Sequence, residues 1–115
     1  MKIVINSDFG GFSLSDEAIE MYGEVKKLNL KGVKDDRFGF TYYYIDGIED
    51  DEHHFSDREV DRSDRELVAI VELLKEKANG TYASLRIVEI PEGVDWYIEE
   101  YDGSEWVAEK HRTWR

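Results

Sequence analysis

The chain has 115 residues, of which 41% are hydrophobic and 37% are charged, and its formal net charge is −12. This length predicts a single domain spanning residues 1–115. The acidic balance argues against binding to a DNA or RNA duplex, because such binding depends on Lys and Arg that neutralise phosphates. The sequence contains no Cys, which excludes disulfides, thiolate metal sites and cysteine nucleophiles.

The N-terminal apolar run is short. Residues 2–6 predict a first strand but lack the length of a signal-peptide core, and nowhere does the sequence approach the roughly 18 apolar residues of a membrane-spanning helix. We therefore expect a cytoplasmic protein with no membrane partner.

A glycine loop, Phe9-Gly10-Gly11-Phe12, follows the first strand and precedes a helix. Apolar residues at three-and-four spacing predict this helix over about residues 15–28, with Ser13 or Ser15 as its N-cap. Residues 29–37 show no clear pattern, and we expect them to be irregular. The aromatic run 38–45 predicts a strand, with one face formed by Phe38, Phe40, Tyr42 and Tyr44.

Residues 46–61 are acidic and aperiodic, which indicates a long mobile loop. The loop holds the ligand-type side chains Asp50, Asp51, Glu52, His53, His54 and Asp57. Metal sites usually need ligands that converge from rigid elements, so we predict no metal site here. A metal-dependent hydrolase remains a distant alternative.

The second helix begins at a predicted capping box, Ser63-Asp-Arg-Glu66, and is predicted to stop at Asn79-Gly80. An apolar strand over residues 85–90 is expected to lie centrally in a sheet.

A closing hairpin turns at Asp102-Gly103, the signature of a two-residue type I′ turn. This register pairs Ile98 with Val107 and Asp95 with Lys110, but it also sets Glu100 opposite Glu105. The like-charge pair indicates that the tip is in water or that the loop is longer. The fold class predicted from these elements is α+β, an antiparallel sheet of about four or five strands with two amphipathic helices.

The sequence has no G-x-S-x-G elbow, no P-loop and no dinucleotide-binding glycine pattern. We therefore predict no catalytic residues, no enzymatic activity and no cofactor. Glycines in Phe9-Gly10-Gly11-Phe12 would let a ligand approach the backbone beside a helix N-terminus, which suits an anion. A plain strand-to-helix connection is the alternative interpretation.

The C-terminal cluster His111-Arg-Thr-Trp-Arg115 is the clearest candidate for recognition. Arg112 and Arg115 offer planar donors that match phosphate, and Trp114 offers a stacking face. A structural tail is the alternative. Exposed Trp and Arg are also typical of interfaces, so we expect a homo-oligomer.

Three groups of segments together resemble a widespread group of small phage proteins: Met1-Lys-Ile-Val-Ile-Asn with Phe9-Gly-Gly-Phe-Ser-Leu-Ser15; Glu66-Leu-Val with Ala78-Asn79-Gly80; and Val88-Glu-Ile-Pro91 with Ile98-Glu-Glu-Tyr-Asp-Gly103 and Ala108-Glu-Lys-His-Arg-Thr-Trp114. This group is similar to the Thoeris anti-defence sponges, phage proteins that bind cyclic ADP-ribose isomers made by bacterial TIR-domain sensors. The resemblance does not cover residues 46–61.

The resemblance implies a homo-oligomer in the host cytoplasm that sequesters a cyclic nucleotide immune signal, and in some members cyclic oligonucleotides, without cleavage. By residue type and placement, the positions to test are Phe9, Phe12, Asn79 and Arg112. The alternative function is a phage interaction protein that binds and inhibits a host protein through an acidic, aromatic surface.

Overall fold

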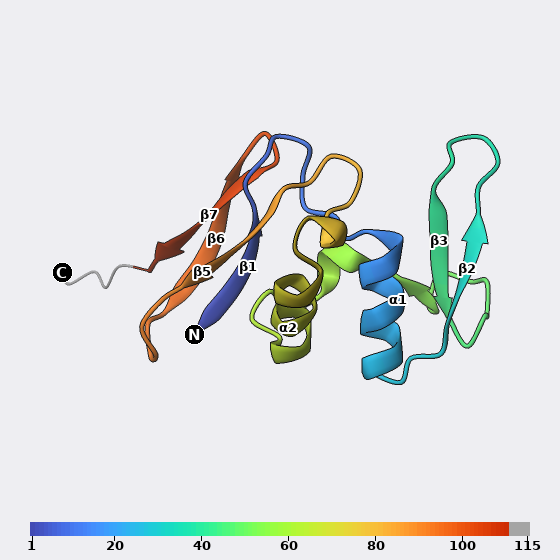
Figure 1. The fold of residues 1–115 in the computed structure, drawn as a ribbon, viewed down its shortest axis with the longest axis horizontal. Helices are drawn as coiled ribbons and strands as arrows, with labels where there is room; N and C mark the ends of the chain where they lie inside the picture. The colour runs from blue at the N-terminus through green and yellow to red at the C-terminus, as the bar shows by residue number, and fades with distance from the viewer. Residues whose placement is uncertain (111–115) are drawn as a thin grey trace.

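The structure, a computed structural model, describes residues 1–110 and has an α+β fold (Figure 1). This confirms the predicted class, but the strands of the described part form three small antiparallel sheets in place of one. The elements in chain order are β1 (Lys2–Asn6), α1 (Asp16–Val25), β2 (Leu30–Lys34), β3 (Thr41–Ile45), β4 (His54–Phe55), the 3-10 turn η1 (Asp57–Glu59), α2 (Arg65–Leu74), the 3-10 turn η2 (Lys75–Ala78), β5 (Leu85–Glu89), β6 (Trp96–Tyr101) and β7 (Ser104–Glu109).

Figure 1 shows the two helices in the middle of an elongated molecule, with β1, β5 and the β6–β7 hairpin at one end and the β2–β3 hairpin at the other. The core lies between the helices and β1, where Val4, Ala18 and Leu67 are completely buried. Strand β1 contacts β5, β7 and α2. Because it is covered on both faces, its apolar run is continuous and does not alternate. Within residues 1–110 no helix has the length and apolar content to cross a membrane.

The start of α1 follows the predicted chemistry. The Ser15 hydroxyl accepts a hydrogen bond from the Ala18 backbone N–H at 3.1 Å, as an N-cap should. The helix ends at Val25, earlier than predicted, and Lys27 and Asn29 just beyond it adopt φ of 58° and 50°. The left-handed Lys27 ends the helical path before Leu28.

The capping prediction for α2 is wrong. The N-cap is Asp64, which accepts from the Glu66 N–H at 3.0 Å, whereas the Ser63 hydroxyl donates to Asp61 at 2.8 Å. The predicted stop is also wrong, because α2 ends where Lys75 adopts φ of 54°. Asn79 has extended backbone geometry, and its side-chain oxygen accepts from the Leu85 N–H at 2.9 Å.

Replacing Asp64 with Ala should lower the unfolding free energy by about 2 kcal/mol at neutral pH, because the carboxylate also accepts from the Tyr22 hydroxyl at 2.7 Å and pairs with Lys26 at 2.9 Å. Burial raises the pKa of Asp64, but hydrogen bonds involving Glu66, Tyr22 and Lys26 outweigh it and hold the pKa below its ordinary value. The stabilisation is therefore present above about pH 4 and is lost as pH falls towards the folded pKa. Urea unfolding at several pH values measures both effects.

Ser63→Ala is the matched control for this prediction. Its hydroxyl bonds only to Asp61 in the described structure. We therefore expect the unfolding free energy to fall by less than about 0.5 kcal/mol, and its decrease at acidic pH to match that of the wild type. A larger loss for Ser63→Ala than for Asp64→Ala would restore the predicted capping box.

Two predictions for the middle of the chain are also wrong. Residues 30–34, expected to be irregular, form β2 and pair with β3. The strand expected over residues 38–45 begins only at Thr41, so Phe38 and Phe40 lie outside it. Tyr42 and Tyr44 share one face and both contact His54, as their alternation predicts, whereas the buried ring of β3 is Tyr43 on the other face.

The acidic segment 46–61 contains β4 and η1 in place of a long loop without structure. Phe55 packs on Tyr22, with ring centroids 5.9 Å apart. Asp57 accepts from the Leu14 N–H at 2.8 Å, and this bond ties the segment to the chain just after the glycine loop. No group of three or more metal-ligating side chains occurs within residues 1–110.

The closing hairpin confirms the predicted turn and register. Asp102 and Gly103 have φ of 51° and 91°, and Ile98 lies opposite Val107. The expected central position of 85–90 is wrong, since in the described structure β5 pairs with β1 alone. Lys110 pairs with Asp95 at the end of the hairpin opposite the turn.

Candidate functional site

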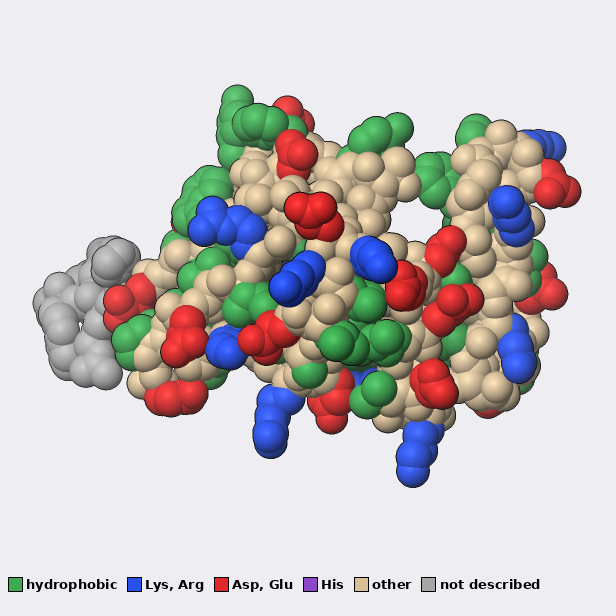
Figure 2. Space-filling model, in the orientation of Figure 1, with side chains coloured by type: hydrophobic (Ala, Val, Ile, Leu, Met, Phe, Trp, Pro, Cys, Tyr) green, Lys and Arg blue, Asp and Glu red, His purple; other side chains and the backbone are tan. Residues whose placement is uncertain are grey.

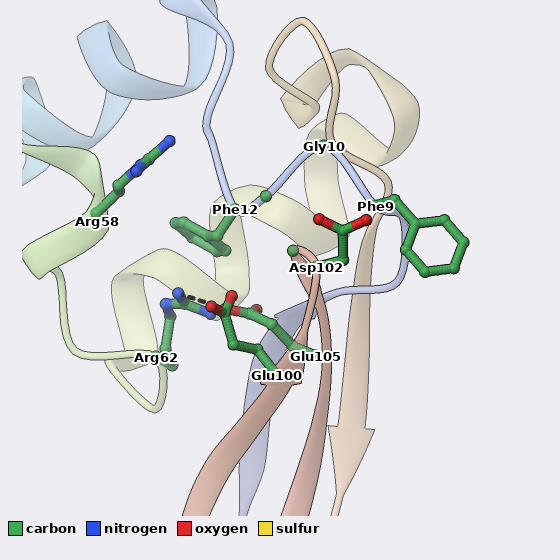
Figure 3. Close-up of a pocket in the computed structure, with 10 residues that line it drawn as sticks. Phe9, Gly10, Phe12, Arg58, Arg62, Glu100, Asp102 and Glu105 are labelled. Carbon is green, nitrogen blue, oxygen red and sulfur yellow. Dashed lines mark hydrogen bonds and ion pairs between the residues drawn. The ribbon is translucent and has the colours of Figure 1, made fainter.

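Two neighbouring cavities flank the glycine loop, residues 9–12. The first, of about 450 Å³, lies between the loop, the Asp102-Gly103 turn and two arginines, Arg58 and Arg62 (Figure 3). The second, of about 650 Å³, lies between the loop, residues 79–82 and the β3–β4 region. Gly10 and Arg58 line both cavities.

Close backbone packing shapes the glycine loop. A Cβ atom on Gly103 would overlap the Phe9 carbonyl oxygen and lie 2.6 Å from the Gly11 nitrogen. A Cβ atom on Gly10 would overlap the Cβ and carbonyl oxygen of Tyr82. The loop is therefore held between the hairpin turn and residue 82, and neither contact leaves room for a side chain.

Asn6, which is completely buried, joins the loop to the hairpin. Its side-chain nitrogen donates to the carbonyl oxygens of Asp8 at 2.7 Å and Gly103 at 2.8 Å, while its oxygen accepts from the Ser84 N–H at 2.8 Å. Sequence reasoning missed this residue. The available signal was a lone amide at the end of an apolar strand, since a buried amide needs such partners.

A buried ion pair forms the floor of the first cavity. Two Arg62 nitrogens bind the two carboxylate oxygens of Glu105 at 2.7 and 3.0 Å, and the side chains are only 13% and 8% exposed. The Arg62 guanidinium also stacks on Phe12, 3.5 Å from the ring centroid. Arg62 neutralises Glu105 and so offsets the repulsion expected between Glu100 and Glu105. The two-residue turn therefore forms although the Glu105 side chain is buried.

Arg58, the other arginine that lines the first cavity, is available to bind a ligand. It is exposed and comes from η1, and its Nη2 atom lies 3.9 Å from the position that a Cβ on Gly11 would occupy. Within residues 1–110 it forms none of the ion pairs. Sequence reasoning missed Arg58 because it falls in the segment predicted to be a mobile acidic loop.

Aromatic rings surround the second cavity. Phe40, Tyr42 and Tyr82 are exposed at its rim, and Tyr43 forms part of its wall. Burial, followed by the nearby carboxylates of Asp16 and Glu20, raises the pKa of Tyr43, so its phenol stays protonated at neutral pH. Figure 2 shows the opening between the loop that contains residues 79–82 and the β2–β3 hairpin.

The predicted site residues divide between the two cavities. Phe9, Gly10, Gly11 and Phe12 line the first, while Asn79 lines the second, and Gly10 connects them. Figure 3 shows that the Phe9 ring points away from the Arg62–Glu105 pair. The predicted residues Arg112, Trp114 and Arg115 lie outside the described part of the chain.

No protein-family model, curated protein or solved structure matches the chain. The geometry of the two cavities is therefore the basis for a functional proposal.

Proposed function

We propose that the protein is a phage anti-defence protein that binds a cyclic nucleotide immune signal, a cyclic ADP-ribose isomer or a cyclic oligonucleotide, at the junction of the two cavities. In this proposal it sequesters the signal in the host cytoplasm without cleaving it. The observation that carries the proposal is the exposed Arg58 guanidinium on the wall that both cavities share, beside the glycine loop.

The chemistry of the junction suits a nucleotide. An arginine fork matches the oxygens of a phosphate, and exposed aromatic rings can stack on a base. Arg58 supplies the fork, and the rings of Tyr42 and Tyr82 border the adjoining cavity. Both cavity volumes fall within the roughly 300–1,000 Å³ typical of small-molecule sites.

The charge around Arg58 favours a small ligand over a nucleic-acid chain. Arg62 is already neutralised by Glu105, whereas the carboxylates of Glu100 and Asp102 also line the first cavity. A compound with one or two phosphates can meet Arg58 without crowding these acids, but a polyanion would meet them repeatedly. The expected homo-oligomer and the expected roles of Arg112, Trp114 and Arg115 belong to the same proposal.

The direct test is depletion of the ligand. The purified protein is incubated with cyclic ADP-ribose isomers and cyclic oligonucleotides, removed by filtration and then heat-denatured. We expect one compound to disappear from the filtrate and to be recovered chemically intact. Recovery of a converted compound would show an enzyme, and no depletion of any compound would refute the proposal.

Arg58→Gln should weaken binding of the depleted compound at least tenfold, because a charge-assisted bidentate contact is lost. Its melting temperature should stay near that of the wild type, since Arg58 is exposed and unpaired within the described residues. Titration calorimetry measures the affinity. Arg65→Gln, which removes another exposed arginine at the start of α2, should bind normally, and equal losses in both variants would indicate a general charge effect.

A further inference from the structure

The β6–β7 hairpin has two faces with different surroundings. Glu105 binds Arg62 and accepts from the Asn6 backbone N–H at 2.8 Å, so its face is turned towards β1. Side chains alternate along a strand, so Trp106 lies on the opposite face. We call this the outer face. Register places on it the side chains of Tyr97, Glu99, Tyr101, Ser104, Trp106 and Ala108.

The outer face carries an ordered group of aromatic residues around one carboxylate. Glu99 accepts from the Tyr97 hydroxyl at 2.7 Å and from the Trp106 indole nitrogen at 2.9 Å. The side chains of Tyr97, Trp106 and Tyr101 are 37%, 44% and 73% exposed. The two hydrogen bonds fix the edges of the Tyr97 and Trp106 side chains, which leaves ring surface exposed to a partner.

No cation among residues 1–110 is paired with Glu99. Both of its donors are neutral. A carboxylate has about four acceptor positions, so two remain for an incoming donor. The hydrogen bond to Glu99 is the leading cause of the raised Tyr97 pKa, and the phenol therefore stays a neutral donor at neutral pH.

A charged carboxylate between exposed aromatic rings matches a cationic side chain. Ring surfaces attract guanidinium and ammonium groups, and a carboxylate binds the same groups through charge-assisted hydrogen bonds. The whole chain carries a net charge of −12, which attracts basic partners over longer distances. The outer face and the net charge of the chain thus both favour a positively charged partner.

We propose that the outer face of the β6–β7 hairpin is a protein-docking surface that captures an Arg or Lys side chain from a basic segment of a partner protein, with Glu99 as the anion and Trp106 and Tyr97 as the ring contacts. This surface is separate from the two cavities, because the hairpin residues that line the first cavity are Glu100, Asp102, Gly103 and Glu105, and no described hairpin residue lines the second. The docking proposal does not depend on the proposed nucleotide binding.

The experiment follows the indole N–H signal of Trp106 by NMR, assigned with Trp106→Phe, while the full-length protein is titrated with acetyl-triarginine amide. We expect a saturable shift of this signal, and little shift with the neutral acetyl-tricitrulline amide. In Glu99→Gln, the amide oxygen can still accept from Tyr97 and Trp106, but the negative charge is lost. This variant should bind triarginine about tenfold more weakly.

Glu109→Gln is the matched control, because it removes one negative charge from the same hairpin on the opposite face, where Glu109 pairs with Trp96. It should change the affinity less than about twofold. The proposal fails if the Trp106 signal does not move, or if both variants weaken binding equally, which would indicate general charge attraction. Sedimentation at rising protein concentration, without peptide, completes the test. If the Trp106 signal shifted as the protein self-associated, the face would bind a second copy of the chain and the proposal of a basic partner would fail.

Discussion

Gly103→Ala should lower the unfolding free energy by roughly 3–5 kcal/mol, among the largest losses expected from a single methyl group in this chain. Gly103 has φ of 91°, where a Cβ atom is unfavourable in any surroundings. That Cβ would also overlap the Phe9 carbonyl oxygen, which cannot rotate away as a side chain could. The turn would have to separate from the glycine loop, and the Asn6 bonds to Gly103 and Asp8 would be strained together. Urea unfolding measures the loss.

Gly93→Ala separates the two causes. Gly93 has φ of 80°, similar to that of Gly103, but a Cβ there would meet nothing within 4 Å. Backbone strain alone should cost about 1–2 kcal/mol. If Gly103→Ala cost no more than Gly93→Ala, the turn would not be packed against the glycine loop as described. A variant of Gly103 that folds should also lose the first cavity, and with it the proposed ligand binding.

Local chemistry explains the parts of the fold that could be predicted from sequence. The type I′ turn depends on two adjacent residues, Asp102 and Gly103, and the cap of α1 depends on Ser15 and Ala18. Such interactions span a few residues and leave a clear pattern. The start of α2 was less predictable because Ser63 and Asp64 are both good caps, and contacts from Tyr22 on α1 and from Lys26 just after it favour Asp64.

The candidate site was only half predictable, because part of it depends on contacts between segments that lie far apart in the sequence. The glycine loop is visible from its composition, whereas Arg58 lies beside it in a segment that accepts, through Asp57, a bond from the Leu14 N–H 43 residues earlier. The acidic composition of residues 46–61 favours a solvent-exposed segment. It does not show that Asp57 accepts from the backbone N–H of the buried Leu14. Likewise, register correctly predicts that Glu100 lies opposite Glu105, whereas the ion pair that neutralises Glu105 depends on Arg62 from a distant segment.

Glu105→Gln should cost about 3 kcal/mol of unfolding free energy, because it leaves the Arg62 guanidinium buried without its counter-ion. The substitution keeps an oxygen that can accept from the Asn6 N–H, so the loss reports mainly on the charge. The same change at an exposed pair, Glu72→Gln beside Lys2, should cost less than about 1 kcal/mol. High salt should reduce the loss at Glu72 and leave the loss at Glu105 nearly unchanged, since buried pairs are weakly screened.

The double variant Arg62→Met with Glu105→Gln decides whether this loss comes from an uncompensated charge. Met can pack on the Phe12 ring that Arg62 now covers, and the remaining Gln can still accept from Asn6. The double variant should therefore be more stable than Glu105→Gln alone, with a coupling energy of roughly 2 kcal/mol or more in the double-mutant cycle. Additive losses would show that Arg62 and Glu105 stabilise the junction independently. In that case relief of the Glu100–Glu105 repulsion would need another source.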